Sequence, residues 1–141
     1  MPDTSVKVDG SFMATKDIYA AGDIATYPDL MRGGQLSRFE HWNMAIQTGA
    51  YAALGMMGKS EPFKYVPFFW TRIFDNSIAY IGHSTDWDEV HMKGEVNAEK
   101  QNFIAFYLKN GKIEAASSLG RGRNIMVLAE AMRLGIAPTA A

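Results

Sequence analysis

"NFIAFYLKNGKIEAASSLG", residues 102–120, carries the clearest signal for secondary structure in the second half of this 141-residue chain. Two runs rich in apolar residues flank Asn110-Gly111. This dipeptide is a strong signal for a two-residue type I′ turn, because asparagine and glycine both tolerate the positive φ angles that the turn requires. The stretch therefore predicts an antiparallel β-hairpin.

Further strands precede this hairpin along the chain. The runs at 68–75 and 77–82, and "VHMKGEV" at 90–96, have the composition of short strands bounded by polar turns. Beyond the hairpin, residues 124–134 predict a helix, and Gly135 marks its expected end. The apolar face of this helix consists of Ile125, Leu128, Ala129 and Met132. The second half thus predicts an antiparallel sheet with a C-terminal helix.

The first half carries a different kind of pattern. "DIYAAGDIA", residues 17–25, is almost entirely apolar, as expected for a strand that is covered on both faces and typically parallel. Residues 26–39 predict a loop interrupted by proline and glycine, and 41–57 predict a helix that stops at Gly58. One helical stripe, expected to lie close on a sheet, consists of Trp42, Ile46, Gly49, Ala53 and Met56. Ser37 and Glu40 have the spacing of a capping box.

A change of composition divides the chain. "KSEPFKYVP", residues 59–67, contains two prolines and predicts a linker. We therefore predict an α+β fold. The end of an α/β domain occupies 1–58, and an antiparallel sheet with a terminal helix occupies 68–141.

The overall composition excludes several classes of protein. A net charge of −1 argues against binding to nucleic acid or to an anionic membrane surface. No apolar run approaches the roughly 20 residues of a membrane span, and no signal peptide opens the sequence, so we expect a cytoplasmic or organellar protein. Because the chain has no cysteine, it holds no disulfide, thiolate metal site or dithiol redox centre.

Three motifs, in this order, resemble the C-terminal part of flavoproteins of the pyridine nucleotide–disulfide oxidoreductase superfamily. They are "VDGSFMATKDIYAAGDIA" (8–25), "RFEHWNMAIQTGAYAALGMMG" (38–58) and "VPFFWTRIF" (66–74). The branch they resemble most is that of the ferredoxin reductases and apoptosis-inducing factor. The resemblance implies that 1–58 is the C-terminal remnant of an FAD-binding domain. It also implies that 68–141 is a reductase C-terminal domain of the dimerisation type.

The resemblance also implies residues that bind a cofactor. Asp23 would lie at the carboxyl end of a parallel strand and accept a hydrogen bond from the ribityl hydroxyls of FAD. The following helix would direct its N-terminus at the pyrimidine edge of the flavin, which places Glu40, His41 and Trp42 beside the isoalloxazine. Trp70 would cover the ring from the C-terminal domain, and Glu40, His41 and Trp70 would face FAD or the nicotinamide. The structural alternatives are a capping role for Glu40 and simple packing, in a core or a dimer interface, for Trp70.

The expected function follows from these motifs and from what is missing. No G-x-G-x-x-G fingerprint is present for the pyrophosphate of FAD or NAD(P)H. We therefore expect the C-terminal fragment of an FAD-dependent NAD(P)H oxidoreductase, inactive without its N-terminal FAD and NAD domains. The intact enzyme would pass electrons through FAD to an acceptor such as an iron–sulfur protein, and no residue here is assigned as a catalytic acid or base. The absence of a cysteine pair favours this branch over the disulfide reductases.

Two alternatives stay open at this point. One is a stand-alone, non-catalytic dimerisation module, in which a homodimer covers the stripe of Trp42, Ile46, Ala53 and Met56. The other is an α+β domain that only echoes the motifs.

Two weaker patterns favour surface loops over binding sites. The first is an acidic segment between the predicted strands at 77–82 and 90–96. Its histidine and carboxylate residues do not have the ligand spacing of a zinc or calcium site; they are His83, Asp86, Asp88, Glu89 and His91. "GRGRNI", residues 120–125, lacks the third glycine of a phosphate loop and predicts a connection with solvated arginines.

Overall fold

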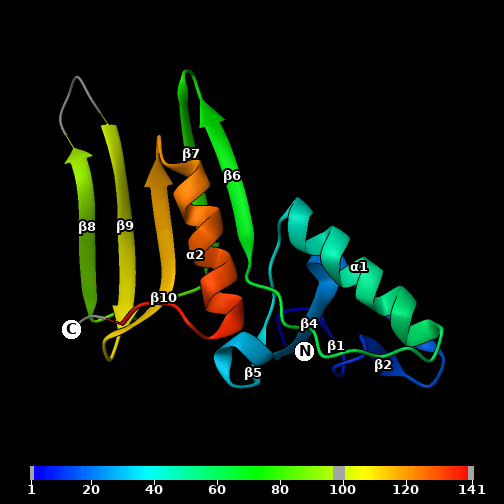
Figure 1. Cartoon of the computed structure of the whole chain (residues 1–141). Helices are drawn as coiled ribbons and strands as arrows, with labels where there is room; N and C mark the ends of the chain where they lie inside the picture. Colours follow the sequence, from blue (N-terminus) through cyan, green and yellow to red (C-terminus); the bar gives the residue numbers. More distant parts are fainter. Residues whose placement is uncertain (1, 97–100, 140–141) are drawn as a thin grey trace. The chain divides into compact units, whose positions relative to one another are not determined.

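The computed structural model of the chain describes residues 2–96 and 101–139, and two compact units are distinguished in it (Figure 1). Unit 1 comprises Met1–Tyr65, and unit 2 comprises Val66–Ala141. Each unit has its own core, and each is described by itself.

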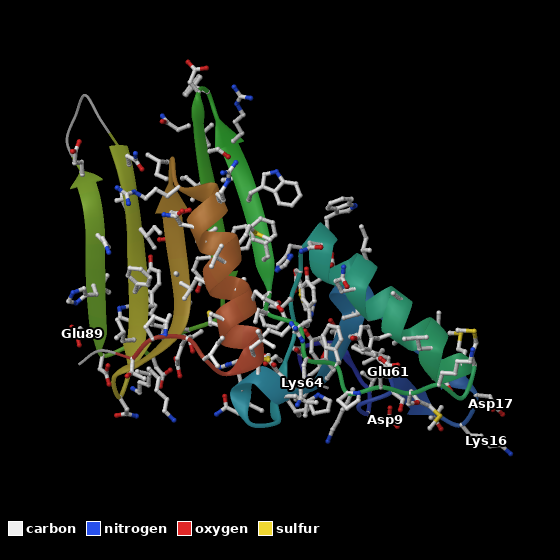
Figure 2. The ribbon with its side chains drawn as sticks, viewed as in Figure 1. Asp9, Lys16, Asp17, Glu61, Lys64 and Glu89 are labelled. Carbon is white, nitrogen blue, oxygen red and sulfur yellow. The ribbon has the colours of Figure 1, made fainter. Side chains whose placement is uncertain are left out.

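Unit 1 contains five short strands in two groups. β1 (Val6–Lys7) pairs in parallel with β4 (Ala25–Asp29), and β4 pairs antiparallel with β5 (Gln35–Ser37). β2 (Met13–Thr15) and β3 (Ile18–Tyr19) form a separate antiparallel pair. In Figure 2 the charged side chains of the turn between β2 and β3, Lys16 and Asp17, extend away from the ribbon.

Two 3₁₀ turns and one long helix complete this unit. η1 (Gly22–Ile24) precedes β4, η2 (Leu30–Arg32) follows it, and α1 spans Trp42–Met56. The predicted helix is therefore confirmed to within one residue at each end. The Lys59 N–H donates to the Leu54 carbonyl and closes the helix, as expected for an end at Gly58.

The strand predicted over 17–25 is wrong in its extent. Apart from Ala25, where β4 begins, only Ile18–Tyr19 is a strand there, and its partner β2 is antiparallel rather than parallel. The chain then turns through η1, and the parallel strand begins only at Ala25. The loop predicted over 26–39 consequently contains most of β4 and all of β5.

The face of α1 that packs in unit 1 is also not the predicted one. The buried stripe consists of Met44, Thr48, Ala52 and Gly55. Gly55 lets this side of α1 approach the Ser11 backbone closely, because a Cβ atom at this position would lie only 2.5 Å from the Ser11 carbonyl oxygen. Trp42 and Met56 of the predicted stripe are 67% and 63% exposed. Since α1 carries apolar residues on both sides, helical spacing alone does not identify the inner face.

Aromatic rings form much of the core of unit 1. The Phe63 ring centroid lies 5.1 Å from that of Phe12, 5.3 Å from that of Tyr27 and 4.8 Å from that of Tyr51, each in an edge-on arrangement. Phe63 belongs to the segment 59–67, which has no helix or strand, yet its side chain is only 4% exposed. This part of the segment is therefore packed into the core of unit 1.

Unit 2 is a five-stranded antiparallel sheet with one helix lying across it. The strand order is β6-β7-β10-β9-β8, and the helix, α2, contacts β7 and β10 (Figure 1). The elements are β6 (Phe68–Ile73), β7 (Asn76–Gly82), β8 (Glu89–Val96), β9 (Gln101–Lys109), β10 (Lys112–Leu119) and α2 (Gly122–Leu134). The predicted α+β fold is confirmed.

The predicted hairpin at the centre of unit 2 is confirmed in its turn as well. Asn110 and Gly111 have φ angles of 50° and 73°, as a type I′ turn requires. β6 and β7 also form a hairpin, which turns at Phe74-Asp75, so the strands predicted over 68–75 and 77–82 are confirmed with their boundary moved toward the N-terminus. On α2, Ile125 and Leu128 are buried and Ala129 and Met132 are half-buried, so the predicted apolar face is also confirmed.

Candidate functional site

Four of the five predicted site residues belong to unit 1, at the start of α1. Asp23 lies in η1, His41 is the N-cap residue of α1, and Glu40 and Trp42 flank it. The structure brings η1 against the first turns of the helix, because the Gly22 N–H donates a 2.9 Å hydrogen bond to Thr48 Oγ1. Asp23 is therefore fixed next to the N-terminal part of α1, although it does not end a parallel strand as predicted.

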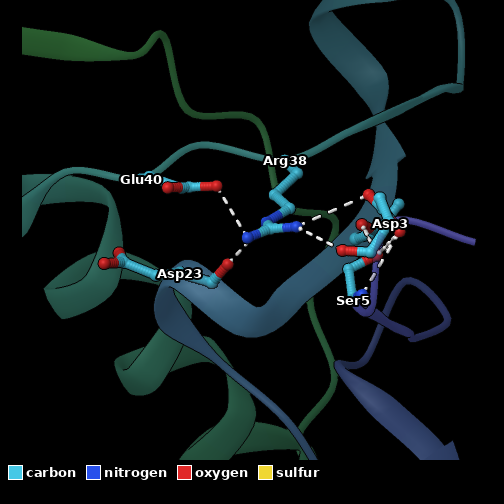
Figure 3. A network of polar contacts seen from close by, with 6 residues as sticks. Asp3, Ser5, Asp23, Arg38 and Glu40 are labelled. Carbon is cyan, nitrogen blue, oxygen red and sulfur yellow. Dashed lines mark hydrogen bonds and ion pairs between the residues drawn. The ribbon is translucent and has the colours of Figure 1, made fainter. Parts of the chain in front are cut away.

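Arg38 connects this turn to two other segments, as Figure 3 shows. Its Nε donates to the main-chain carbonyl of Asp23 at 2.7 Å, and Nη2 forms an ion pair with Glu40 at 2.6 Å. Nη1 donates to the main-chain carbonyl of Asp3 at 3.2 Å and lies 3.5 Å from the Asp3 carboxylate. No role of Arg38 is predicted from the sequence. Its only signal there was a charged residue inside the motif that carries Glu40, His41 and Trp42.

Asp3 is itself held to the sheet of unit 1. Its Oδ1 accepts hydrogen bonds from the N–H and the hydroxyl of Ser5, at 3.2 and 2.8 Å. The buried Ser5 hydroxyl lies 2.7 Å from Thr26 Oγ1 on β4. The hydrogen bonds from Ser5, with a smaller effect of the Arg38 charge, lower the pKa of Asp3. The carboxylate that Arg38 contacts is therefore ionised at neutral pH.

The predicted capping box is wrong. Ser37 is part of β5, where its hydroxyl accepts from Arg32 Nη1 at 3.1 Å, and no side chain caps α1 at His41. The Glu40 carboxylate pairs with Arg38, so it does not have the capping role that was the structural alternative. The first N–H groups of a helix have no partner within the helix, and their dipoles favour an anion.

His41 and Trp42 differ in their exposure. Burial lowers the pKa of His41, while the negative charge of Asp23 opposes the shift. The imidazole is therefore neutral at pH 7, and its ring packs against Phe39 at a centroid distance of 6.1 Å. Trp42 is 67% exposed, so a ligand or another protein surface can reach its indole.

The fifth predicted residue, Trp70, lies on β6 in unit 2. Its indole stacks on the ring of Phe68, with centroids 5.5 Å apart and planes 23° from parallel, and the residue is 52% exposed. The indole is therefore not buried in the core of unit 2. A pocket shared by Trp70 and Asp23 stays a prediction.

The chemistry of the unit 1 residues fits the flavin that the sequence resemblance implies. Asp23 offers an exposed carboxylate acceptor for a hydroxyl donor, and the uncapped N-terminus of α1 offers positive N–H dipoles to the electron-rich edge of a ring. No metal site competes with this interpretation: within 2–96 and 101–139, no group of three or more His, Asp or Glu side chains is placed to hold an ion. Across the same ranges, no helix is long and apolar enough to cross a bilayer.

The residues of the acidic loop in unit 2 are engaged in local contacts. Asp86 pairs with Lys109 at 3.4 Å, the Asp88 carboxylate accepts from the Asn110 N–H at 2.9 Å, and Glu89 lies 3.3 Å from His91. In "GRGRNI", the predicted solvated loop is wrong for Arg121, whose Nε donates to the Asn102 side chain at 2.8 Å. α2 begins inside this segment.

Comparison with known proteins gives a consistent result. Residues 68–141 match the family described as Reductase C-terminal. The chain is 32% identical to mouse apoptosis-inducing factor 3 over 118 residues, which cover 84% of the chain and 19% of that protein. It is 29% identical to the peroxisomal monodehydroascorbate reductase 1 of Oryza sativa subsp. japonica, over 97% of the chain and 30% of that protein.

Solved structures show the same relationship. A ferredoxin reductase from Rhodopseudomonas palustris matches with a TM-score of 0.85 at 28% identity, over 96% of this chain and 33% of that one. The covalent complex of putidaredoxin reductase with putidaredoxin has the same fold, with a TM-score of 0.81 at 20% identity over 92% of this chain and 30% of that one. The chain thus spans about a fifth to a third of the length of these proteins.

Proposed function

Because the chain belongs to the reductase C-terminal family, and is the C-terminal part of a flavoprotein of the pyridine nucleotide–disulfide oxidoreductase superfamily, we propose that it forms one wall of an FAD site. In this proposal, residues 1–58 complete an FAD-binding domain and 68–141 form the reductase C-terminal domain. Residues 59–67 link the two. The rest of the FAD domain and the NAD(P)H domain lie on polypeptide outside this chain. By itself the chain would not transfer hydride.

One observation carries the proposal. The exposed carboxylate of Asp23 and the uncapped N-terminus of α1 lie together, held by Thr48 and Arg38. Asp23 would accept a hydrogen bond from a ribityl hydroxyl of FAD. The first turn of α1, with His41 and Trp42, would contact the pyrimidine side of the flavin.

Each remaining residue has a role that needs no acid–base step. A neutral His41 adds no positive charge beside the flavin, and Glu40 with Trp70 would face FAD or the nicotinamide. The indole of Trp70 offers a half-exposed surface for stacking that excludes water from the ring. Bound FAD would accept hydride from NAD(P)H and release electrons singly, which is chemistry that the cofactor supplies. An iron–sulfur protein is the acceptor that we propose, and the solved reductase–putidaredoxin complex supports a protein acceptor.

Purification of the full-length protein tests this function. We expect it to carry FAD and its visible flavin band to bleach when NADH or NADPH is added without oxygen. Reduction of an added ferredoxin would follow in the same cuvette. A full-length protein that binds no FAD under any reconstitution condition would rule out the proposal.

A second candidate, a homodimer, is supported by the outer face of α1. Trp42, Ile46 and Met56 are 67%, 46% and 63% exposed, and large apolar side chains exposed along one face of a helix often mark a surface that binds another protein. If this face joins two copies, Ile46→Asp should convert a dimer to a monomer in analytical ultracentrifugation. The matched change on the exposed face of α2, Val127→Asp, should not. A wild-type monomer at every concentration would eliminate this candidate.

A further inference from the structure

We infer that Arg38 is a positioning residue for the FAD site, which holds the backbone of Asp23 so that its carboxylate is presented to the ligand. The inference rests on the proposed function of Asp23. It adds a residue that touches no ligand and acts only through Asp23 and Glu40.

The backbone around Asp23 is held on both sides. On the N-terminal side, the Gly22 N–H donates to Thr48 Oγ1 at 2.9 Å, and the Thr48 hydroxyl in turn donates to the Met44 carbonyl at 2.8 Å. On the C-terminal side, the Asp23 carbonyl accepts from Arg38 Nε at 2.7 Å. With the peptide groups on both sides fixed, the direction of the Asp23 side chain is restricted.

Arg38 binds the carbonyl of Asp23 rather than its carboxylate. The other two nitrogens of the guanidinium are directed to Glu40, at 2.6 Å, and to Asp3, at 3.2 and 3.5 Å. Among the described residues, no hydrogen bond or ion pair engages the Asp23 carboxylate. The Arg38 guanidinium is paired with Glu40 and Asp3, so it does not pair with the Asp23 carboxylate. That carboxylate can therefore accept a hydrogen bond from a ligand.

Asp3, which binds the Arg38 guanidinium, is itself held in place by hydrogen bonds. Asp3 accepts two hydrogen bonds from Ser5, and the Ser5 hydroxyl contacts Thr26 of the buried strand β4 at 2.7 Å. The Arg38 side chain is only 27% exposed, so solvent does not compete freely for its donors. The guanidinium therefore ties η1, the segment before α1 and the sheet into one arrangement (Figure 3). Lysine cannot reproduce this arrangement, because it has no planar set of donors.

The test compares Arg38→Ala and Arg38→Lys with Arg72→Ala in the full-length flavoprotein. Arg72 is a matched control on the exposed end of β6, where its Nε also donates to a carbonyl, that of Phe74, and its Nη2 lies near a carboxylate, that of Asp75. Three quantities are measured: the FAD dissociation constant of the apoprotein, the visible circular dichroism of bound flavin, and the Tm of the apoprotein.

We expect Arg38→Ala to weaken FAD binding at least about tenfold and to change the circular dichroism of the flavin that still binds. Arg38→Lys should give an intermediate loss, and Arg72→Ala should leave both quantities at wild-type values. A purely structural role would lower the apoprotein Tm and leave the flavin spectrum unchanged.

Two results would overturn the inference. One is wild-type FAD affinity and circular dichroism in Arg38→Ala. The other is an equal effect of Arg72→Ala. If Arg38→Ala does not fold, Asp3→Asn loosens the same anchor and decides between the same outcomes. If the wild-type protein binds FAD and the Arg38 variants bind it equally well, only the role of Arg38 is wrong. If the wild-type protein never binds FAD, the proposed function is wrong, and this inference with it.

Discussion

Unit 1 and unit 2 differ in how far apart along the chain the residues in contact lie. In unit 2, β9 and β10 are joined by a two-residue turn, and β6 and β7 by another, so the strands of these two pairs are close in sequence, whereas β7 and β10 pair over a long separation. In unit 1, Phe12, Tyr27 and Phe63 meet in one core, and Arg38 joins Asp3 to Asp23. Unit 2 is thus built from two local hairpins joined by one long-range strand pair, whereas the core and the polar contacts of unit 1 depend on distant segments throughout.

This difference coincides with the placement of the proposed cofactor residues. The long-range contacts of unit 1 involve polar side chains, and they fix the turn that carries Asp23. The corresponding contacts in unit 2 are mainly those of a regular sheet and a helix that covers part of it. Four of the five proposed cofactor residues therefore lie in the unit whose structure depends on distant segments. Four predictions test this comparison, starting with the largest expected effect.

Removal of the Phe63 ring should unfold unit 1 selectively. Phe63→Ala leaves a cavity among three other rings, which costs about 3–5 kcal/mol of unfolding free energy. Amide hydrogen exchange should show lost protection in β4 and α1 and unchanged protection in β7, β9 and β10. The matched control Phe74→Ala removes a ring that is 90% exposed and should have almost no effect. Equal loss of protection in both units would show that they do not have separate cores.

A methyl group added at Gly82, at the end of β7, should lower the unfolding free energy of unit 2. Gly82 has a φ of +72°, and a Cβ atom there would overlap the Glu114 carbonyl oxygen on the neighbouring strand β10. Gly82→Ala should therefore cost about 2–3 kcal/mol or more, measured by denaturant unfolding. Gly111→Ala is the control, because φ is similar at +73° but no atom lies within 4 Å of its Cβ, and about 1 kcal/mol is expected. Equal losses would mean that backbone strain, and not the contact across β7 and β10, decides the effect.

The smallest stability effect expected in unit 1 depends on pH. Burial lowers the pKa of His41 below its usual 6.5, so the unfolded chain binds a proton at this position more readily than the folded one. The contribution of neutral His41 to the free energy of unfolding is fully present above about pH 6.5, and it is lost as the pH falls through the lowered pKa. Urea midpoints for unit 1 should decrease over this window, and His41→Gln should remove that part of the decrease. An unchanged slope in His41→Gln would assign the pH dependence to other groups.

The same comparison explains what could be predicted from the sequence. The turn at Asn110-Gly111 and the apolar face of α2 follow from neighbouring residues, and the structure confirms both. The position of β4 does not follow from neighbours, because an apolar run such as 17–25 fits a strand or a covered turn equally well. The parallel pairing with β1 is what selects Ala25–Asp29.

The candidate site shows the same limit. Asp23, Glu40, His41 and Trp42 were identified through motifs, but nothing in their spacing indicates that Arg38 binds the carbonyl of Asp23. That contact depends on the turn at η1, on Thr48 and on the N-terminal segment at Asp3, which are far apart in sequence. The inner face of α1 was missed for a related reason: the close approach of Gly55 to Ser11 is a tertiary contact.

Flavin occupancy of the full-length protein with Asp23→Ala tests whether this chain forms part of the FAD site. Asp75→Ala, which removes a fully exposed carboxylate from unit 2, is the control for the same substitution. The ratio of flavin absorbance to protein absorbance is measured for both variants and the wild type after gel filtration. We predict a clear loss of FAD from Asp23→Ala, with wild-type protection of the unit 2 amides and full occupancy in Asp75→Ala. Full occupancy in Asp23→Ala would contradict the role of this chain as a wall of the FAD site.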